Sequence, residues 1–394
     1  MSERDPIFED ALRAADIEAV AGVKLYGGGA SRRGECPLCG RGKGMKGAGA
    51  FSVKVREKIW FCFGCEEGGD VIDLEHALHS KPGETLRDAA VRLAGEGYTP
   101  AQGFRADATQ ERRSAERAEA REKAFKAQRA SDIWREAVPA AGTPVETYLR
   151  GRGLFGPWLA AMLAQLRFHP DVYHSGPRGD ERRAPGMIGL LMTPAGPTGG
   201  VHITYLAPCG RGKADLEPAK KMLGPQDRDG MPGGLWLTPP DGEGPLIVAE
   251  GIESCGSAGA LVGIWPCRMA AALSLRNLQG GWLADKYGRR DVDAPRADPE
   301  HPAFTWPAPA GGWGDLMIAV DRDMAPFPVK VRRSRGGTVK RRMTPDERAK
   351  VCGSLAEQAW RRAGAHGVRT IAPGQGRDFN DELRARLASD EVCQ

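Results

Sequence analysis

The sequence predicts a multidomain α/β protein with a small N-terminal β domain, a helical linker, an α+β region and a Rossmann-like C-terminal domain. Three observations support this fold class. Two Cys-x2-Cys pairs flank a strand-like alternation near the N-terminus, a long polar stretch without Gly or Pro follows, and two apolar runs in the last third end in acidic residues. At 394 residues the chain can bury more than one core.

The charged residues are unevenly distributed along the chain. The protein has 56 Lys and Arg residues and 51 Asp and Glu residues, a net charge of +5. Residues 30–60 contain eight basic and two acidic side chains, and residues 326–348 have the same ratio. Such local positive fields suggest a polyanionic partner, although a run of charges is more often a solvated face.

The apolar residues give no indication of a membrane span. No uninterrupted apolar run approaches the ~18 residues that cross a bilayer, and the N-terminus lacks the apolar segment of a signal peptide. We therefore expect a soluble, cytoplasmic protein with no membrane partner. In that reducing compartment, clustered cysteines indicate a metal site and not a disulfide framework.

Four of the nine cysteines have the spacing of a zinc site. Cys36 and Cys39 form one Cys-x2-Cys pair, and Cys62 and Cys65 form a second pair after 22 residues. Two such turns can aim four thiolates at one tetrahedral Zn²⁺ with Zn–S bonds of ~2.3 Å. Because four protein ligands leave no open position, we expect a structural zinc. A redox Cys-x2-Cys motif would explain one pair and leave the other without a purpose.

The residues around these cysteines have the pattern of a zinc ribbon. Residues 51–56 alternate apolar and polar side chains, which predicts a half-buried strand. After the last cysteine, Asp70 is placed to cap a helix over residues 71–78. Since four thiolates complete the zinc site, we expect His76 and His79 to be surface residues of that helix.

The middle of the chain indicates a linker helix and then a β-hairpin. Residues 105–137 are rich in Ala, Glu, Arg and Lys, and residues 187–192 and 201–206 are strand-like runs on either side of a Pro- and Gly-rich turn. The string Gly-Arg-Gly-Lys at 210–213 lacks the rest of a phosphate loop, so a P-loop ATPase is not expected. A basic rim follows, for which phosphate contact and plain solvation are both open: Lys213, Lys220 and Lys221.

Acidic residues follow two apolar runs in the last third of the chain. Residues 246–249 precede Glu250, and residues 316–320 precede Asp321 and Asp323. Continuous apolar runs indicate strands covered on both faces, hence a parallel sheet, and acids after such strands lie at its carboxyl edge. Carboxylates brought together there would repel one another without a cation, and hard oxygen ligands favour Mg²⁺ or Mn²⁺.

The same region predicts the alternating elements of a Rossmann-like unit. We expect further strands at residues 259–266 and 368–374 and helices at residues 269–278 and 347–365. Two segments do not fit this alternation. We interpret residues 282–313 as an irregular insertion and residues 328–348 as a flexible basic loop near the acidic edge, where it could follow a nucleic-acid backbone.

The N-terminal part of the sequence resembles a known family. The segments ECPLC, AFSVKVREKIWFCFGC and GGDVIDL resemble the zinc-binding domain of bacterial and phage DNA primases over residues 16–95. Many cellular primases have a histidine where this chain has Cys39, so the all-cysteine form of some phage primases is more similar. The stretch AKKMLGP is similar to a lysine-bearing primase stretch and places Lys221 at the matching position.

The C-terminal region is similar to the Toprim domain of primases, topoisomerases and some nucleases. Glu250, Asp321 and Asp323 match its signature acids, and Asp378 matches a further acidic position. The chain departs from the primase pattern at two positions, since Ser254 and Asn380 replace aspartates, although Asp381 follows the second one.

The resemblance implies four domains and a phage- or plasmid-type DNA primase. The expected domains are a template-binding zinc ribbon (1–98), a helical linker (99–140), a basic N-terminal subdomain of the primase polymerase core (141–243) and a Toprim domain (244–394). The implied reaction is synthesis of short RNA primers from nucleoside triphosphates on single-stranded DNA. Mg²⁺ or Mn²⁺ would be held by the Toprim acids. No Walker motif follows them, so a replicative helicase would be a separate partner.

Template and substrate contacts complete the implied site. Lys221, Lys220 and Lys213 would contact phosphates, and the ribbon would hold single-stranded template through Lys54, Arg56, Lys58 and Trp60. Alternatively, Trp60 and the adjacent Phe61 fill the ribbon's core. Two other functions stay open: a replication accessory protein that binds nucleic acid without synthesis, and a Toprim nuclease or topoisomerase.

Overall fold

The structure is a computed structural model that describes residues 5–27, 31–42, 49–65, 67–81, 83–95, 105–176, 181–285, 288–332 and 337–392. Side chains of residues 105–116, 118, 119, 391 and 392 are outside this description. The chain divides into two compact units, Met1–Arg117 with His174–Arg182, and Ala118–Tyr173 with Arg183–Gln394. We call them the ribbon unit and the α/β unit. Within the described residues, no helix has both the length and the apolar character needed to cross a membrane.

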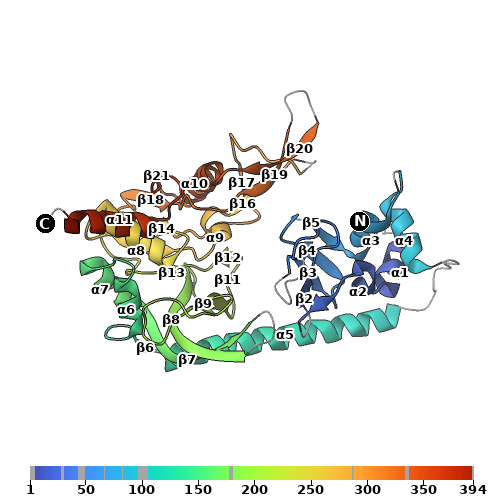
Figure 1. The fold of residues 1–394 in the computed structure, drawn as a ribbon, viewed down its shortest axis with the longest axis horizontal. Helices are drawn as coiled ribbons and strands as arrows, with labels where there is room; N and C mark the ends of the chain where they lie inside the picture. Colours follow the sequence, from blue (N-terminus) through green and yellow to red (C-terminus); the bar gives the residue numbers. More distant parts are fainter. Residues whose placement is uncertain are drawn as a thin grey trace. The chain divides into compact units, whose positions relative to one another are not determined.

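The ribbon unit is an antiparallel five-stranded sheet with short helices (Figure 1). Its elements are α1 (Pro6–Ala14), α2 (Ile17–Ala21), β1 (Leu25–Tyr26), β2 (Ser31–Gly34), β3 (Phe51–Lys54), β4 (Ile59–Cys62), β5 (Glu67–Asp70), α3 (Val71–His79) and α4 (Leu86–Ala94). The alternation in β3 and β4 buries Phe51, Val53 and Trp60 against α1 and α3. Asp70 caps α3 through a capping box with Asp73, as the sequence predicted for Asp70.

A long helix and a second antiparallel sheet follow. The helix α5 (Arg105–Glu136) covers the predicted linker and is 32 residues long. The sheet has the order β10-β9-β8-β7-β6, and two helices lie between β6 and β7 in the chain. Its elements are β6 (Val138–Pro139), α6 (Pro144–Arg150), α7 (Gly156–Gln165), β7 (Arg167–Ser175), β8 (Glu181–Thr193), β9 (Gly196–Tyr205) and β10 (Lys220–Leu223). The antiparallel pairing of β8 with β9 confirms the predicted hairpin.

The third sheet, of order β13-β15-β14-β18-β21, is parallel except for the edge strand β13. Its strands are β13 (Leu235–Trp236), β14 (Leu246–Ala249), β15 (Arg268–Ala271), β18 (Asp315–Ala319) and β21 (Gly367–Ile371). The helices α8 (Ile252–Val262) and α11 (Phe379–Val392) cover one face, and α10 (Pro345–Arg362) covers the other. Both faces are therefore apolar, which explains the continuous apolar runs in the sequence.

Two expected elements of this unit are wrong. Residues 259–266 form no strand, because α8 continues to Val262 and a turn follows. The strand is β15, within the segment expected to be a helix over 269–278, and the short helix α9 (Leu275–Gln279) comes after it. A four-residue buried strand has too few residues to show a period, so its Ala-rich sequence resembled a helix.

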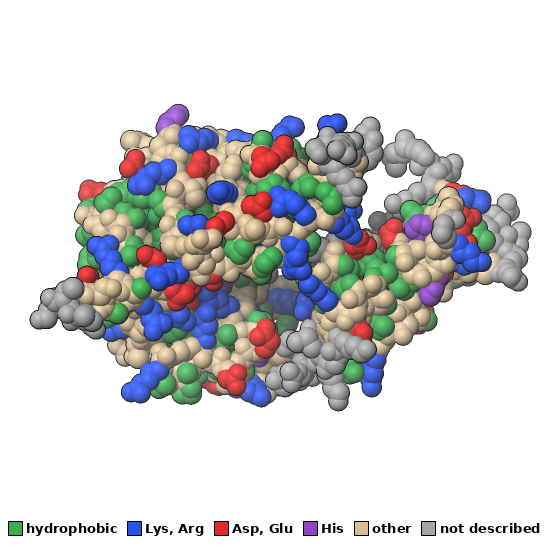
Figure 2. Space-filling view, turned by 45° about the horizontal axis from the view of Figure 1, so that its top comes forward, with side chains coloured by type: hydrophobic (Ala, Val, Ile, Leu, Met, Phe, Trp, Pro, Cys, Tyr) green, Lys and Arg blue, Asp and Glu red, His purple; other side chains and the backbone are tan. Residues whose placement is uncertain are grey.

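Short antiparallel strand pairs lie outside the larger sheets. The pair β11 (Asp227–Arg228) with β12 (Met231–Pro232) precedes β13 in the chain. The predicted insertions contribute β16 (Gly281–Trp282) with β17 (Ala297–Asp298), and β19 (Phe327–Arg332) with β20 (Thr338–Met343). The basic segment expected to be a flexible loop is thus a β-hairpin projecting from the α/β unit, with residues 333–336 outside the description (Figure 1). Basic and acidic side chains are interspersed on the face drawn in Figure 2.

Candidate zinc site and active site

The four cysteines meet in the ribbon unit. The distance between Sγ atoms is 3.7 Å for Cys39 and Cys62 and 3.9 Å for Cys36 and Cys65, and all four sulfurs lie within 4.8 Å of one another. Ligands of a tetrahedral zinc with Zn–S bonds of ~2.3 Å are about 3.8 Å apart. The donor set and its spacing therefore fit Zn²⁺ with four thiolates and no open position.

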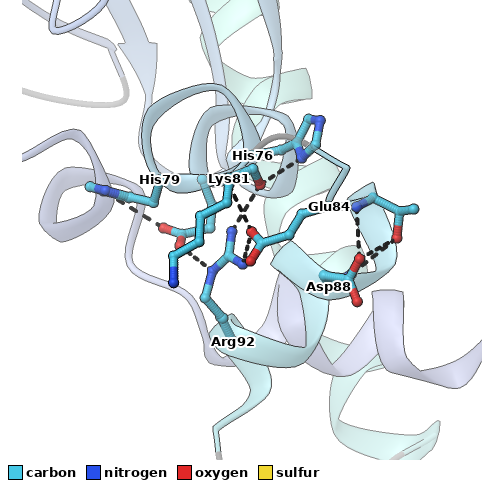
Figure 3. Close-up of polar contacts among 9 residues, drawn as sticks. His76, His79, Lys81, Glu84, Asp88 and Arg92 are labelled. Carbon is cyan, nitrogen blue, oxygen red and sulfur yellow. Dashed lines mark hydrogen bonds and ion pairs between the residues drawn. The ribbon is translucent and has the colours of Figure 1, made fainter.

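The two histidines of α3 belong to a separate polar network (Figure 3). His76 Nδ1 lies 2.7 Å from Ser80 Oγ, and His79 Nε2 lies 3.9 Å from Glu75 Oε2. Arg92 of α4 donates a hydrogen bond to Glu75 Oε1 at 3.0 Å, which joins the two helices. These contacts agree with the expectation that both histidines are helix residues outside the zinc site.

The ribbon's sheet presents different aromatic residues from the one predicted. Trp60 is 5% exposed, packs on Phe51 and donates its indole N–H to the carbonyl of Asp70, so it is a core residue and cannot stack on a base. The exposed aromatic side chains are Phe61 and Phe63, at 41% and 55% exposure, in an edge-to-face pair with centroids 5.1 Å apart. The guanidinium of Arg33 lies over the Phe63 ring at 4.9 Å.

The predicted basic residues of the ribbon have two different roles. Lys58 donates hydrogen bonds to the carbonyls of Leu12 and Arg13 at 2.6 and 2.7 Å, so it caps the end of α1. The ammonium group of Lys58 is thus engaged within the ribbon unit, and its contact with template stays a prediction. Lys54 and Arg56 are exposed, in agreement with a surface role.

In the α/β unit, the predicted acids line one cavity of about 300 Å³, which we call the acid cavity. Glu250 follows β14, Asp321 and Asp323 follow β18, and Asp378 follows β21. These are the carboxyl ends of three adjacent parallel strands. The same lining contains three cationic side chains, those of Arg152, Lys213 and Lys220. Lys221 is not among the lining residues, since side chains alternate along β10.

Hydrogen bonds hold Asp321 at the centre of this edge. Its carboxylate accepts from the backbone N–H of Phe379 at 3.0 Å and from Ser254 Oγ at 2.8 Å. Burial raises the pKa of Asp321 to about 6, although both hydrogen bonds act in the opposite direction. Burial also raises the pKa of Glu250, which the charge of Lys220 partly opposes. A cation in the cavity would keep both groups ionised.

Ser254 and Asn380, which differ from the primase pattern, both form hydrogen bonds within the fold. Ser254 supplies the hydroxyl that binds Asp321. Asn380 is buried and donates to the carbonyl of Arg152 and, at 3.1 Å, to Ser257 Oγ. Asp378 caps α11 by accepting from the backbone N–H of Asp381 at 2.7 Å. Both replacements therefore join elements around the cavity.

A buried glutamate that sequence reasoning missed lies behind Lys220. Glu253 accepts hydrogen bonds from Lys220 Nζ at 2.9 Å and from Tyr148 Oη at 2.6 Å. Burial acts to raise the pKa of Glu253, but the charges of Lys220 and Lys213 outweigh it and the pKa is lowered. The only signal in the sequence was a second acid three residues after Glu250, on the first turn of α8.

The acids fit a hydrated cation better than a closed metal cage. Among the described residues, the four cysteines are the only group of three or more candidate ligands whose donor atoms lie within 4.8 Å of one another. Direct ligands of one Mg²⁺ are at most about 4.2 Å apart, twice the ~2.1 Å bond. Glu250, Asp321 and Asp323 thus do not all bind one ion directly in this arrangement. Mg²⁺ usually keeps several waters and uses one or two carboxylates, which these residues supply.

Comparisons with known proteins give limited similarity. A family model described as a domain of unknown function (DUF7146) matches residues 124–232, and no curated protein matches. The crystal structure of the Aquifex aeolicus primase (zinc-binding and RNA polymerase domains) is 16% identical, with a TM-score of 0.35 over 99% of this chain and 84% of that chain.

Two further solved structures show similar values. The DnaG primase catalytic domain bound to ssDNA is 12% identical, with a TM-score of 0.35 over 69% of this chain and 81% of that chain. The primase fragment of the bacteriophage T7 primase-helicase protein is 11% identical, with a TM-score of 0.30 over 91% of this chain and 96% of that chain.

Proposed function

We propose that the protein is a DNA primase of phage or plasmid type, which makes short RNA primers on single-stranded DNA. The observation that supports this proposal is the acid cavity, whose lining contains Glu250, Asp321 and Asp323 together with Lys213 and Lys220 at the carboxyl edge of a parallel sheet. Nucleotidyl transfer requires acidic groups that hold a divalent cation and basic groups that hold phosphates. The acid cavity contains both kinds of side chain.

The side chains of the acid cavity have different roles in this reaction. Lys220, held by Glu253, and Lys213 bind the triphosphate of the incoming nucleotide. Ser254 and the Phe379 N–H fix the orientation of the Asp321 carboxylate toward the reacting phosphate. Mg²⁺ or Mn²⁺, when bound, would neutralise charge on the phosphates and favour ionisation of the attacking 3′-hydroxyl.

The ribbon supplies the template contact in this proposal. Phe61 and Phe63 offer exposed ring faces and edges for base stacking, and Arg33, Lys54 and Arg56 offer positive charge for the phosphate backbone. Zinc would act only by holding the two Cys-x2-Cys turns together. A separate helicase would provide the single-stranded template.

A primer-synthesis assay tests the proposal. Purified protein is incubated with single-stranded DNA, labelled nucleoside triphosphates and Mg²⁺ or Mn²⁺, beside Asp321→Ala and the control Asp315→Asn. Asp315 is an exposed acid at the opposite end of the same strand. We expect labelled oligomers from the native chain and from the control, and none from Asp321→Ala. If the native chain binds DNA but makes no oligomers with any template or metal, the protein is an accessory factor instead.

A further inference from the structure

A second cavity of the α/β unit has no role in the proposed reaction. It has a volume of about 430 Å³, larger than that of the acid cavity, and it is lined by α9, by the insertion strands β16 and β17, by the hairpin β19–β20 and by α10. Its apolar part includes Leu275, Phe327, Met343 and Val351. Two insertions that interrupt the Rossmann-like alternation thus build a concave surface. We call it the arginine cavity.

The charged side chains of this cavity are mostly arginines. Arg276, Arg290 and Arg348 line it together with His301, and Asp298 is the one acidic side chain of the lining. The Asp298 carboxylate lies 2.8 Å from His301 Nδ1, so its charge is already directed at a neighbour. The cavity is therefore a site with an excess of positive charge, and its cations are guanidinium groups that match phosphate in a bidentate geometry.

Two of the arginines are held in place by aromatic rings. The guanidinium of Arg290 lies over Trp282 at 5.6 Å and donates to the Trp282 carbonyl at 3.3 Å. The guanidinium of Arg348 lies over Phe327 at 5.0 Å and donates to the carbonyl of Ala325 at 2.7 Å. Preorganised donors lose less conformational entropy when an anion binds. Arg276, in contrast, is exposed, and its side chain makes no hydrogen bond or ion pair with another described residue.

The arginine cavity is next to the acid cavity. Leu273 lines the acid cavity and Leu275 lines the arginine cavity, so the residues leading into α9 separate them. The backbone N–H of Leu273 donates to the carbonyl of Glu250 at 2.7 Å. The charge of Arg348, which lines the arginine cavity, also acts to lower the pKa of the Glu250 carboxyl.

We propose that the arginine cavity binds a nucleoside polyphosphate, at a site separate from the acid cavity. Three guanidinium groups around one concave surface match the several charges that a polyphosphate concentrates in a small volume, and the apolar lining suits a base or sugar. A nucleic-acid backbone spreads its charges along the strand, one per nucleotide, whereas these three guanidinium groups lie around a single cavity. The site does not depend on whether the protein makes primers.

The test is nucleotide binding without added divalent cation. Under that condition the carboxylates of the acid cavity repel a polyphosphate, whereas the arginine cavity needs no metal. Binding of ATP and GTP to the full chain is measured by isothermal titration calorimetry, without a chelator so that the zinc site stays intact. We expect binding by the native chain and a loss of about tenfold or more in affinity for Arg276→Glu, because the variant replaces a charge-assisted hydrogen bond with repulsion.

A matched variant tests the location of the bound nucleotide. Arg384→Glu makes the same charge change at an exposed position of α11 outside the cavity. It should bind ATP as the native chain does. Absence of binding in the native chain, or an equal loss in Arg384→Glu, would overturn the proposal. So would a 5′-phosphorylated oligonucleotide that displaces ATP while an excess of ATP does not displace it, because the site would then serve a nucleic-acid end.

Discussion

Glu253 is a buried residue of the acid cavity, and Lys220 and Tyr148 donate hydrogen bonds to its two carboxylate oxygens. The contact with Glu253 fixes the ammonium group of Lys220 among the lining residues of the cavity. Lys221 is not among them, because side chains alternate along β10.

We expect Glu253→Gln to lower the free energy of unfolding by about 1–3 kcal/mol at about pH 7, because it leaves Lys220 without its charged partner. Lys220 is partly exposed, which keeps the loss below that of a fully buried pair. The pKa of Glu253 is lowered in the folded state, so its contribution is present above the ordinary glutamate pKa and is lost as the pH falls toward the folded value. The difference from the native chain should therefore shrink at about pH 4.

Urea unfolding of native protein, Glu253→Gln and Glu243→Gln at both pH values measures this effect. Glu243 is an exposed glutamate of the same unit, and its substitution should change stability by less than about 0.5 kcal/mol. A Glu253→Gln difference that grew in acid would contradict the lowered pKa.

At the scale of elements, the hairpin β3–β4 sends alternate side chains to opposite faces. Val53 pairs with Trp60 on the core side, and Ser52 pairs with Phe61 on the exposed side. A shift of one residue in the register would exchange these faces, so the cysteine at the end of β4 and the exposed phenylalanine are fixed together. The same alternation of side chains along β4 therefore places Cys62 on the core side and Phe61 on the exposed side.

We expect Phe63→Ala to weaken binding of single-stranded DNA by about tenfold, because a stacked aromatic residue contributes ~1–3 kcal/mol per base. The fold should be retained, since Phe63 is exposed. Trp60→Ala, in contrast, should destabilise the ribbon unit by about 3–5 kcal/mol through loss of its core. Fluorescence anisotropy with a labelled oligonucleotide measures binding, and circular dichroism checks the fold.

The matched control is Phe125→Ala, which removes an exposed phenylalanine of α5 that is 67% exposed. It should bind DNA as the native chain does. Equal weakening by Phe125→Ala and Phe63→Ala would show that the ribbon face has no special role.

At the scale of the whole molecule, local spacing was readable from the sequence and long-range packing was not. The cysteine pairs and the acids after strands could be predicted because each signal lies within a few residues. The contact of Tyr148 with Glu253 joins positions 105 residues apart, and the arginine cavity needs segments from Leu275 to Val351. The burial of Trp60 also depended on packing against helices, since alternation gives two faces without saying which is covered.

The two units have separate hydrophobic cores, which leads to a prediction about zinc removal. The core of the ribbon unit is built around Phe51, Val53 and Trp60, and that of the α/β unit around strands β14 and β18. Zinc bound only to the folded ribbon adds its binding free energy to the stability of that unit alone.

We therefore expect a chelator to remove hydrogen-exchange protection from β3 and β4 while β14 and β18 keep theirs. Readdition of Zn²⁺ should restore the lost protection. Loss of protection in both units would mean that they unfold as one cooperative body, and no loss in β3 and β4 would mean that the cysteines hold no metal needed for the fold.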